Sequence, residues 1–430
     1  MKELKIGLIG LGTVGTGVVR LLHQNRALLE KRLGRKLTLC KIADSDLTRD
    51  RGIPLDKSLL TTDAYKIITD PEISVVIELI GGISPAKEFI KDALKRGKHV
   101  VTANKALLAK HGDELFSLAN NVNKCLLFEA SVGGGIPIIK SVREGLIGNS
   151  FQSVYGILNG TANYILTRMS KDSIDFEEAL RDAQQRGYAE ADPELDISGL
   201  DSSHKLAILA TLLYGKFFSV DDIYVEGITD LSQMDIEYAD QWGYTVKLLA
   251  ITKLIDGKIV LKVHPTLLGK QTMLASVSDT YNALFYTGDF VGNGMLYGRG
   301  AGEAPTASAV MSDIVDICRY SEHNDVPLLC AKRAHPEDII PFELLESRSY
   351  LRVNALDEPG VLAKIAGVLG ENDISIASVI QKERRKGAVV PVVMMTHQAL
   401  EKNFNKAQEE IDSLDVIKQK TVRIRVEDKL

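Results

Sequence analysis

The sequence has little of what marks disulfide-bonded, membrane or nucleic-acid-binding proteins. Its 430 residues include four cysteines, none in a CxxC pair, and thiols this sparse favour a reducing compartment over a disulfide framework or a cysteine-built zinc site. No apolar run reaches the roughly 18 residues that a bilayer span needs. Lys and Arg total 52 against 57 Asp and Glu, a net charge of −5, so no basic field attracts nucleic acid or an anionic membrane. We therefore expect a cytoplasmic protein without a membrane or nucleic-acid partner.

Residues 1–130 alternate short β-branched runs with amphipathic stretches, which predicts parallel strands joined by helical crossovers. The expected strands are Lys5–Ile9, Leu37–Ala43, Val75–Ile80, His99–Thr102 and Cys125–Phe128. Helices are expected after the first strand and over Ala86–Arg96, which Gly97 ends. The fold class is therefore α/β, with an N-terminal Rossmann-like doubly wound sheet that residues 305–335 complete.

Two further domains are expected. Residues 131–304 predict an α+β domain around a second, mixed sheet. Residues 336–349 have the prolines and charges of a linker, and residues 350–430 read strand-helix-strand-strand-helix-strand, the βαββαβ order of a ferredoxin-like sandwich. The elements expected in that last domain are Tyr350–Ala355, Val361–Gly370, Ile374–Glu383, Ala388–Thr396, Ala399–Ile411 and Val416–Val426, with Arg384–Gly387 as a hairpin turn.

A glycine-rich loop, Gly10-Leu11-Gly12-Thr13-Val14-Gly15, joins the first strand to the first helix. Gly10 permits the tight turn, Gly12 lets the backbone approach a pyrophosphate, and Gly15 lets helix and strand pack closely. The N-terminus of the helix adds free N–H groups and positive potential. This strand-turn-helix context predicts dinucleotide binding rather than a merely tight turn.

The choice between NAD and NADP stays open. Asp44 follows the second strand, where a carboxylate takes a ribose 2′-hydroxyl and favours NAD. Arg49 and Arg51 lie just beyond and would accept the 2′-phosphate of NADP. All three side chains are equally consistent with a solvated charged loop.

Two other strands end in residues suited to a ligand crevice. The third expected strand, Val75–Ile80, runs into Gly81-Gly82, where a nicotinamide ring would lie against bare backbone. The next one runs into Ala103-Asn104-Lys105, which brings Lys105 to the crevice mouth. The alternative for Lys105 is an ordinary exposed surface lysine.

The densest group of charges lies between residues 187 and 205. Glu190, Asp192, Glu194 and Asp196 share a loop, and the helix that follows carries Asp201 and Lys205 four residues apart on one face. A lysine on the buried side of a helix is costly unless it is paired or functional, and an apolar wall would bring its pKa into a useful range. The alternative is a surface ion pair beside a solvated acidic loop. We interpret the adjacent His204 as structural.

These charges suggest a substrate that carries an ammonium group, with an oxygen that must gain or lose a proton as hydride moves. Hydride transfer needs orientation and proton management rather than a protein nucleophile. None of the cysteines lies in a plausible nucleophile loop, which argues against an aldehyde dehydrogenase that uses a thiolate.

Over essentially its whole length the sequence resembles the homoserine dehydrogenase family, in the bacterial type with a C-terminal ACT domain. The matching segments are Gly10–Gly15, Thr102-Ala103-Asn104-Lys105, Glu129–Pro137, Leu158-Asn159-Gly160-Thr161, Gly187–Pro193, Asp201–Leu206, Tyr297–Ser308 and, for the ACT domain, Leu356–Leu362 and Ile374–Gln381. The resemblance implies interconversion of L-homoserine and L-aspartate 4-semialdehyde with NAD(P), in the branch from aspartate to threonine, methionine and isoleucine.

The resemblance also implies roles for single residues. Lys205 would be the general acid/base, and Lys105 would contact cofactor and substrate. The residues implied to bind substrate are Glu190 and Asp201, supported by Asp192 and Asp196. The residues implied to contact the nucleotide, beyond the glycine loop, are Thr13, Val14, Gly187 and Gly302. A monovalent cation, with sodium as the candidate, would sit at Glu129, Val132, Gly134 and Ile136.

For the C-terminal domain the resemblance implies side-by-side pairing and an amino acid bound near a strand-to-helix loop. The candidate residues are Asn354, Asp357, Gly360 and Val361. We expect feedback inhibition by threonine, against the alternative of a domain kept only for oligomerisation. The family further implies a homodimer, which ACT contacts would extend to a homotetramer.

Two other functions remain open. A nucleotide-sensing regulatory protein would combine the dinucleotide loop and the ACT domain without turnover, although it has no need for a proton donor at Lys205. A dehydrogenase acting at the amine-bearing carbon of another amino acid would also have to handle ammonia.

Overall fold

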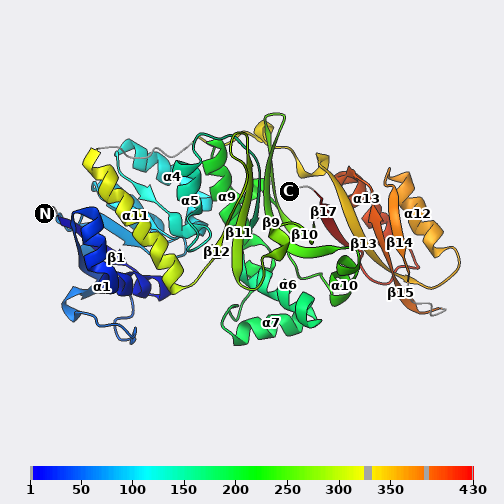
Figure 1. The fold of residues 1–430 in the computed structure, drawn as a ribbon, viewed down its shortest axis with the longest axis horizontal. Coiled ribbons are helices and arrows are strands. Elements are labelled where there is room, and N and C mark those ends of the chain that lie inside the picture. The colour runs from blue at the N-terminus through cyan, green and yellow to red at the C-terminus, as the bar shows by residue number, and fades with distance from the viewer. Residues whose placement is uncertain (1–2, 324–331, 382–386, 429) are drawn as a thin grey trace. The chain divides into compact units, whose positions relative to one another are not determined.

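The computed structural model describes residues 3–323, 332–381, 387–428 and 430. Figure 1 shows the helices and strands of the chain coloured by residue number. The chain divides into two compact units, each made of three stretches of sequence. The first unit comprises Met1–Phe151, His204–Asp222 and Asn282–His335; the second comprises Gln152–Ser203, Ile223–Tyr281 and Pro336–Leu430. Cys330 and most of the expected turn Arg384–Gly387 lie outside the described residues. Within the described ranges, Cys40, Cys125 and Cys318 form no disulfide.

The first unit contains a parallel sheet in the order β3-β2-β1-β4-β5-β6. Its strands are β1 (Glu3–Ile9), β2 (Lys36–Ala43), β3 (Leu60–Thr61), β4 (Val75–Glu78), β5 (His99–Thr102) and β6 (Leu126–Leu127). Each neighbouring pair is parallel. This arrangement confirms the doubly wound, Rossmann-like sheet that the alternating pattern predicts.

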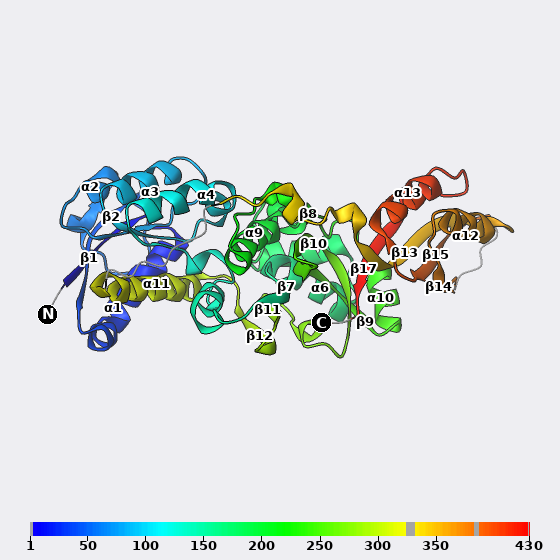
Figure 2. The same ribbon diagram turned by 90° about the horizontal axis from the view of Figure 1, so that it is seen from above.

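Helices cover both faces of this sheet (Figure 2). The helices α2 (Tyr65–Ile68), α3 (Ala86–Lys95) and α4 (Lys105–Asn121) lie on one face, and α1 (Thr13–Leu33) and α11 (Glu303–His323) lie on the other. The last of these comes from far along the chain, yet Val310 and Ile314 share a core with Val18 of α1. The two helices pack closely at Gly17, where a Cβ would lie 2.8 Å from the carbonyl oxygen of Glu303.

The second unit is built on a mixed sheet. Its strands, in order of pairing, are β7 (Phe151–Ile157), β9 (Tyr244–Ile255), β10 (Lys258–Gly269), β17 (Val422–Glu427), β13 (Glu346–Leu356), β15 (Val389–Thr396) and β14 (Ile376–Ile380). The β9–β10 pair is a long antiparallel hairpin that turns at Asp256-Gly257, both with positive φ. The short strand β8 (Tyr224–Val225) pairs with β10.

The helices of this unit belong to two groups. Between β7 and β9 along the chain lie α6 (Gly160–Asp172), α7 (Phe176–Gln185), α8 (Glu194–Ile197) and α10 (Gln233–Gln241). Helix α9 (Leu200–Tyr214) begins in this unit, but from His204 on its residues belong to the first unit. The other group, α12 (Val361–Glu371) and α13 (Glu401–Asp412), shares a separate core with β13 and β15, built around Val353, Ile365, Met394 and Phe404. The order β13-α12-β14-β15-α13-β17 confirms the ferredoxin-like βαββαβ pattern.

The C-terminal strand joins two parts of the second unit. One edge of β17 pairs antiparallel with β13, and the other pairs parallel with β10 from Thr266 to Leu268. The Nη1 of the buried Arg425 in β17 also donates to Glu226 at 2.6 Å. The strand begins later than the expected Val416, because Ile417 forms only an isolated bridge to Ala355 and the ladder itself starts at Val422.

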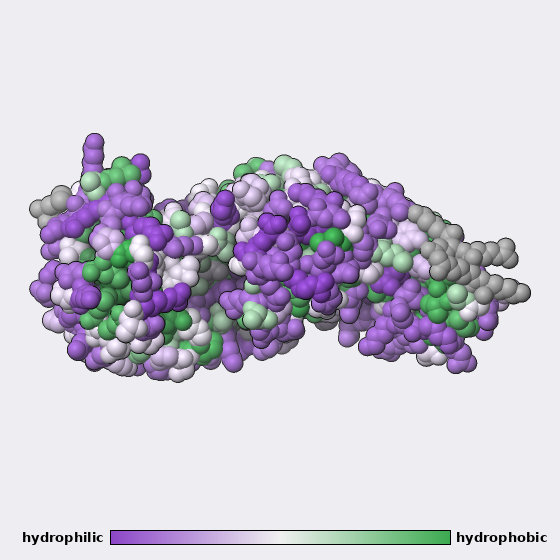
Figure 3. Space-filling view, turned by 90° about the horizontal axis from the view of Figure 1, so that it is seen from below, coloured by the Kyte–Doolittle hydropathy of each residue, from purple (hydrophilic) through white to green (hydrophobic). Residues whose placement is uncertain are grey.

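No helix in the described part of the chain is long and apolar enough to cross a membrane. Hydrophilic residues cover most of the face drawn in Figure 3, and hydrophobic residues on it form separate groups.

Four further elements complete the description. They are β11 (Tyr281–Gly288), β12 (Gly292–Arg299), the 3-10 turn η2 (Glu129–Ser131) and α5 (Ile138–Lys140).

Candidate active site

The glycine-rich loop has the close packing that the motif predicts. Gly10 has φ 101°, and a Cβ there would lie 2.7 Å from the backbone of Leu79. A Cβ at Gly15 would lie 2.1 Å from the carbonyl oxygen of Gly10, so glycine is required at both positions. Gly12 precedes α1 without a side-chain cap and faces open space. The first N–H groups of α1 are therefore available to an anion.

A cavity of about 440 Å³ adjoins this loop. It is lined by the backbone of Gly10 and Gly12, by Asp44 after β2, and by Thr62, Pro85 and Phe89. Asp44 accepts hydrogen bonds from Leu11 N and, at 3.2 Å, from Nη2 of the buried Arg51. Asp44, the residue expected to favour NAD, and Arg51, one of the two expected to favour NADP, are thus in contact with each other.

The ends of β4 and β5 present the other expected features of this crevice. Gly81 and Gly82 are exposed and have positive φ of 73° and 69°. Lys105 is half-buried as the first residue of α4, and Asn104 caps that helix by accepting from Leu107 N at 3.1 Å. Because these strands are neighbours, both segments emerge at the carboxyl edge of the sheet.

The carboxylates of residues 190–201 differ in their exposure to solvent. Glu190 and Asp192 are exposed in the loop after α7, which leaves its helix at Gly187 (φ 73°). Asp196, in α8, is half-buried, and Asp201, in the first turn of α9, is only 6% exposed. Glu194 is exposed as well, so the structure separates three exposed carboxylates from the less exposed Asp196 and Asp201.

Asn159 brings the two less exposed carboxylates together. Its Nδ2 donates to Oδ1 of Asp196 at 2.7 Å and to Oδ2 of Asp201 at 2.8 Å. Its Oδ1 accepts from Ala162 N and so caps α6. We did not single out Asn159 from the sequence, although its place just before a helix is the pattern of an N-cap residue.

Lys205 lies on the buried side of α9, 9% exposed, one turn after Asp201. The preceding turn is tight, because Gly199 has φ 86° and a Cβ there would lie 3.2 Å from Val225 and Val263. Such packing holds the first turn of the helix in place. Burial excludes the alternative that Asp201 and Lys205 form an exposed surface pair.

The segment implied to hold a cation centres on Glu129, which is 2% exposed in η2. Its carboxylate accepts from Ile139 N at 3.0 Å and from Lys140 N at 2.7 Å. Burial raises the pKa of Glu129 to about 7, despite these hydrogen bonds. Gly134 (φ 55°) packs against the chain after β12, where a Cβ would meet the carbonyl oxygen of Gly300 at 2.4 Å. Val132 and Ile136 are buried beside them.

The remaining implied residues lie at two helix N-termini. Gly302 (φ 117°) directly precedes α11. In the C-terminal part, Gly360 (φ 91°) precedes α12, which begins at the buried Val361. Asn354 is occupied by a 2.7 Å hydrogen bond to Gln419, and Oδ2 of Asp357 is buried without a hydrogen-bond partner among the described residues.

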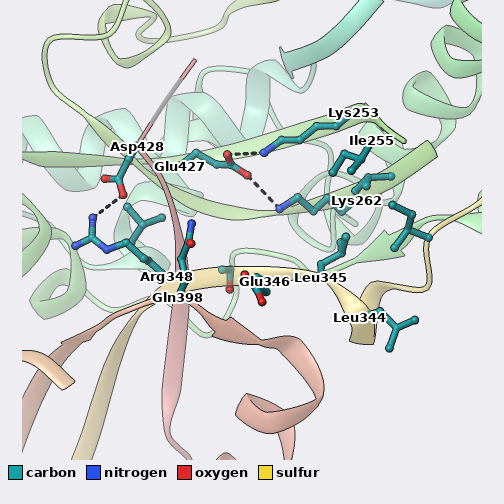
Figure 4. A pocket seen from close by; sticks show the side chains of 14 residues that line it. Lys253, Ile255, Lys262, Leu344, Leu345, Glu346, Arg348, Gln398, Glu427 and Asp428 are labelled. Atoms are coloured by element: carbon teal, nitrogen blue, oxygen red, sulfur yellow. Dashed lines mark hydrogen bonds and ion pairs between the residues drawn. The ribbon is translucent and has the colours of Figure 1, made fainter. Parts of the chain in front are cut away.

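Another cavity, of about 540 Å³, lies among β9, β10, β13 and β17 (Figure 4). At its floor, Glu427 pairs with Lys253 at 2.8 Å and with Lys262 at 3.1 Å. At its rim, Arg348 pairs with Asp428. These ion pairs connect the last strand to the β9–β10 hairpin, and we assign them to structure.

Comparison with known proteins identifies the family. Residues 137–315 match the homoserine dehydrogenase family model, residues 10–129 match the model of its NAD-binding domain, and residues 349–416 match the ACT domain. Homoserine dehydrogenase of Pseudomonas aeruginosa is 42% identical over 99% of both chains. The crystal structure of a homoserine dehydrogenase from Thiobacillus denitrificans, 43% identical, superposes with a TM-score of 0.93 over 100% of this chain and 99% of that one. A hyperthermophilic archaeal homoserine dehydrogenase solved with NADPH is 26% identical, with a TM-score of 0.63, over 73% of this chain and 97% of that one. The chain therefore belongs to the homoserine dehydrogenase family.

Proposed function

We propose that this chain catalyses the NAD(P)-dependent interconversion of L-homoserine and L-aspartate 4-semialdehyde, in the synthesis of threonine, methionine and isoleucine. Similarity to homoserine dehydrogenases over the whole length supports this activity. The observation that carries the proposal is the first turn of α9, where the buried Lys205 follows Asp201 on one helix face. A buried ammonium beside a carboxylate is suited to donating and accepting a proton.

The proposed chemistry requires one proton transfer from the chain. When bound, the nicotinamide supplies the hydride for reduction and accepts it in oxidation. The ammonium of Lys205 donates its proton to the aldehyde oxygen during reduction and recovers it from the homoserine hydroxyl during oxidation. Asp201 lies one helical turn before Lys205 and would serve as its counter-ion, and burial of both side chains keeps bulk water from competing for the proton. Lys105 would contact cofactor and substrate at the carboxyl edge of the parallel sheet.

The substrate ammonium group would bind where Asn159 holds Asp196 and Asp201 together. Two carboxylates joined through a neutral amide leave excess negative charge, which a bound cationic group compensates. The exposed Glu190 and Asp192 would add attraction at the entrance and further contacts. This arrangement favours an amino-acid substrate over an uncharged alcohol.

The cofactor would lie along the glycine loop, with contacts at Gly10, Gly12, Thr13, Val14, Gly15, Lys105, Gly187 and Gly302. We propose that either NAD or NADP is accepted, because Asp44 suits the ribose hydroxyl of NAD and Arg51 would pair with the 2′-phosphate of NADP. Replacing Arg51 with Gln should lower kcat/KM for NADP about tenfold and leave the value for NAD within about threefold. Equal losses with both cofactors would contradict this assignment.

A monovalent cation, with sodium as the candidate, is proposed at Glu129, Val132, Gly134 and Ile136. One buried carboxylate with backbone carbonyl oxygens fits a hard ion of low charge. The cation would fix the loop between η2 and α5. Adding sodium in place of tetramethylammonium should raise the Tm and the activity together, and an unchanged Tm would remove the proposed site.

Threonine is proposed to bind the ACT domain near Asn354, Asp357, Gly360 and Val361 and to inhibit the enzyme. Among the described residues the buried Oδ2 of Asp357, at the strand-to-helix loop, has no hydrogen-bond partner, and this supports a polar ligand there. Activity measured at millimolar threonine tests this proposal, and no change in activity would leave oligomerisation as the role of the domain.

Three further expectations also stay predictions. They are a homodimer or homotetramer, the cytoplasmic location, and the domain boundaries 130/131, 304/305 and 349/350.

The proposed reaction is tested by assaying homoserine against other amino acids with both cofactors. We expect oxidation of homoserine and no ammonia release. Cofactor binding without turnover of any substrate would favour a nucleotide sensor, and ammonia release from another amino acid would favour a dehydrogenase acting at the amine-bearing carbon.

A further inference from the structure

A fully buried carboxyl group ends the strand that leads into Gly81 and Gly82, where the nicotinamide is proposed to lie. Glu78 is the last residue of β4 and is 0% exposed. Burial raises the pKa of Glu78 above its usual value, although hydrogen bonds from Thr102, Ile80 and Gly81 act in the opposite direction. Interior strands of parallel sheets are usually apolar, and burying a carboxyl group costs free energy that its hydrogen bonds must offset.

One oxygen of Glu78 organises the glycine turn. Its Oε1 accepts from Ile80 N at 2.9 Å and from Gly81 N at 3.3 Å. These bonds hold the chain as it enters Gly81 and Gly82, both in the left-handed region. Glycines lose more backbone freedom on ordering than other residues, so the turn needs such an anchor to keep one shape.

The other oxygen connects this turn to the neighbouring strand. Glu78 Oε2 accepts from Thr102 Oγ1 at 2.7 Å, and these two residues are direct partners in the β4–β5 ladder. The same hydroxyl oxygen accepts from Asn104 N at 3.0 Å. The Nδ2 of Asn104 then donates to the carbonyl oxygen of Gly82 at 2.6 Å. A closed ring of hydrogen bonds therefore joins residues 78–82 to residues 102–104.

We propose that Glu78 and Thr102 are positioning residues for the hydride-transfer reaction, which they serve by holding the Gly81–Gly82 backbone and Lys105 in one fixed relation. Lys105 follows Asn104 directly, and Asn104 both closes the ring and caps α4. Any shift of the ring would move the glycine backbone and the first turn of α4 relative to each other. This inference rests on the proposed function, which places both segments at the reacting end of the cofactor.

The matched pair Thr102→Val and Thr102→Ser tests the proposal. Val keeps the shape of Thr but loses the hydroxyl, whereas Ser keeps the hydroxyl and so preserves the ring. We expect kcat to fall about 10- to 100-fold in Thr102→Val, since small misplacements of reacting groups have effects of that size. We expect kcat within about twofold of wild type in Thr102→Ser. Glu78→Gln keeps only one acceptor oxygen, so it cannot accept from both Thr102 Oγ1 and the N–H groups of Ile80 and Gly81. It should therefore resemble Thr102→Val.

Two readouts separate positioning from a purely structural role. The KM for cofactor should change less than about threefold in each variant, because the glycine loop at Gly10–Gly15 is untouched. The primary isotope effect with cofactor deuterated at the transferred position should increase, because hydride transfer becomes slower relative to product release. A lowered Tm with unchanged kcat and isotope effect in soluble Thr102→Val would overturn the proposal.

Lys105→Ala, measured in parallel, distinguishes failure of this inference from failure of the proposed function. If Lys105→Ala loses activity while Thr102→Val and Glu78→Gln keep theirs, only the positioning role is wrong. If Lys105→Ala, Thr102→Val and Glu78→Gln all turn over normally, this edge of the sheet is not the reaction site, and both proposals fail.

Discussion

Asp201 accepts a 2.8 Å hydrogen bond from Nδ2 of Asn159, the residue that caps α6. The same nitrogen donates to Asp196, so one amide sets the positions of two carboxylates from different helices. A cap residue that would otherwise serve only helix stability thus also shapes the proposed substrate site.

Replacing Asn159 with Ser should separate these two roles. Ser retains a capping oxygen but cannot donate to both carboxylates, so we expect the KM for homoserine to rise about tenfold, as loss of a charge-assisted hydrogen bond implies. The Tm should change by only a few degrees.

Asp175 provides the control for this experiment, since it caps α7 through Glu178 N. Asp175→Ala should lower stability by about 1 kcal/mol without changing the KM. A normal KM for homoserine in Asn159→Ser would show that the amide does not organise substrate binding.

Gly12 and Gly145 offer a matched pair for the cofactor loop. A Cβ meets no atom within 4 Å at either position, so Ala should leave the Tm of both variants nearly unchanged. Only Gly12 lies where the pyrophosphate is proposed to approach the backbone, and we expect Gly12→Ala to raise the KM for NAD(P) about tenfold or more. Equal cofactor KM values in the two variants would remove Gly12 from the cofactor site.

His99, buried in β5, should make stability depend on pH. Burial lowers the pKa of His99 to about 4, below the 6.5 of an exposed histidine. The unfolded chain therefore binds this proton first as the pH falls, and the stability present above pH 6.5 is lost progressively down to about pH 4. The full difference is about 3 kcal/mol.

The pH effect is measured as the free energy of unfolding of wild type and His99→Gln at pH 7.5 and pH 5. The difference between the two proteins should shrink at the lower pH. His23→Gln is the control, because His23 is exposed. A difference that does not vary with pH would contradict the assignment to His99.

Glu427 should contribute to the free energy of unfolding, because its ion pairs connect β17 to the β9–β10 hairpin. Burial disfavours its charge, but Lys262 and Lys253 hold the pKa of Glu427 below its usual value. Glu427→Gln leaves two largely buried ammonium groups without a counter-ion, which should cost about 3–5 kcal/mol. Glu346→Gln, at an exposed position of the same cavity, should cost less than about 0.5 kcal/mol. Equal unfolding free energies for the two variants would contradict this account.

Local patterns were sufficient for much of the fold. The strand-turn-helix signature at Gly10–Gly15 predicted the dinucleotide loop, and Pro85 and Gly97 bracket α3 as expected. By contrast, the pairing of β17 with β10 depends on residues about 160 positions apart, and no local pattern encodes such a contact. Helix α6 was not predicted either, because most of its faces are buried and it lacks a clear apolar stripe.

The candidate site also has features that local sequence predicts and features that depend on the tertiary structure. Spacing alone placed Asp201 and Lys205 on one helix face, since a helix relates residues four apart. The links made by Asn159 and by the Glu78–Thr102 pair come from side chains far apart in sequence. They become visible only when the strands and helices that carry them are placed side by side.

The central claim is that Lys205 transfers the proton, and the turnover of Lys205→Ala and Lys205→Arg with homoserine tests it most directly. We predict that kcat falls at least about 10²-fold in both variants, because alanine has no proton to give and arginine does not release one. The Kd for NAD(P) should stay within about threefold of wild type. Wild-type kcat in soluble Lys205→Ala would contradict the account.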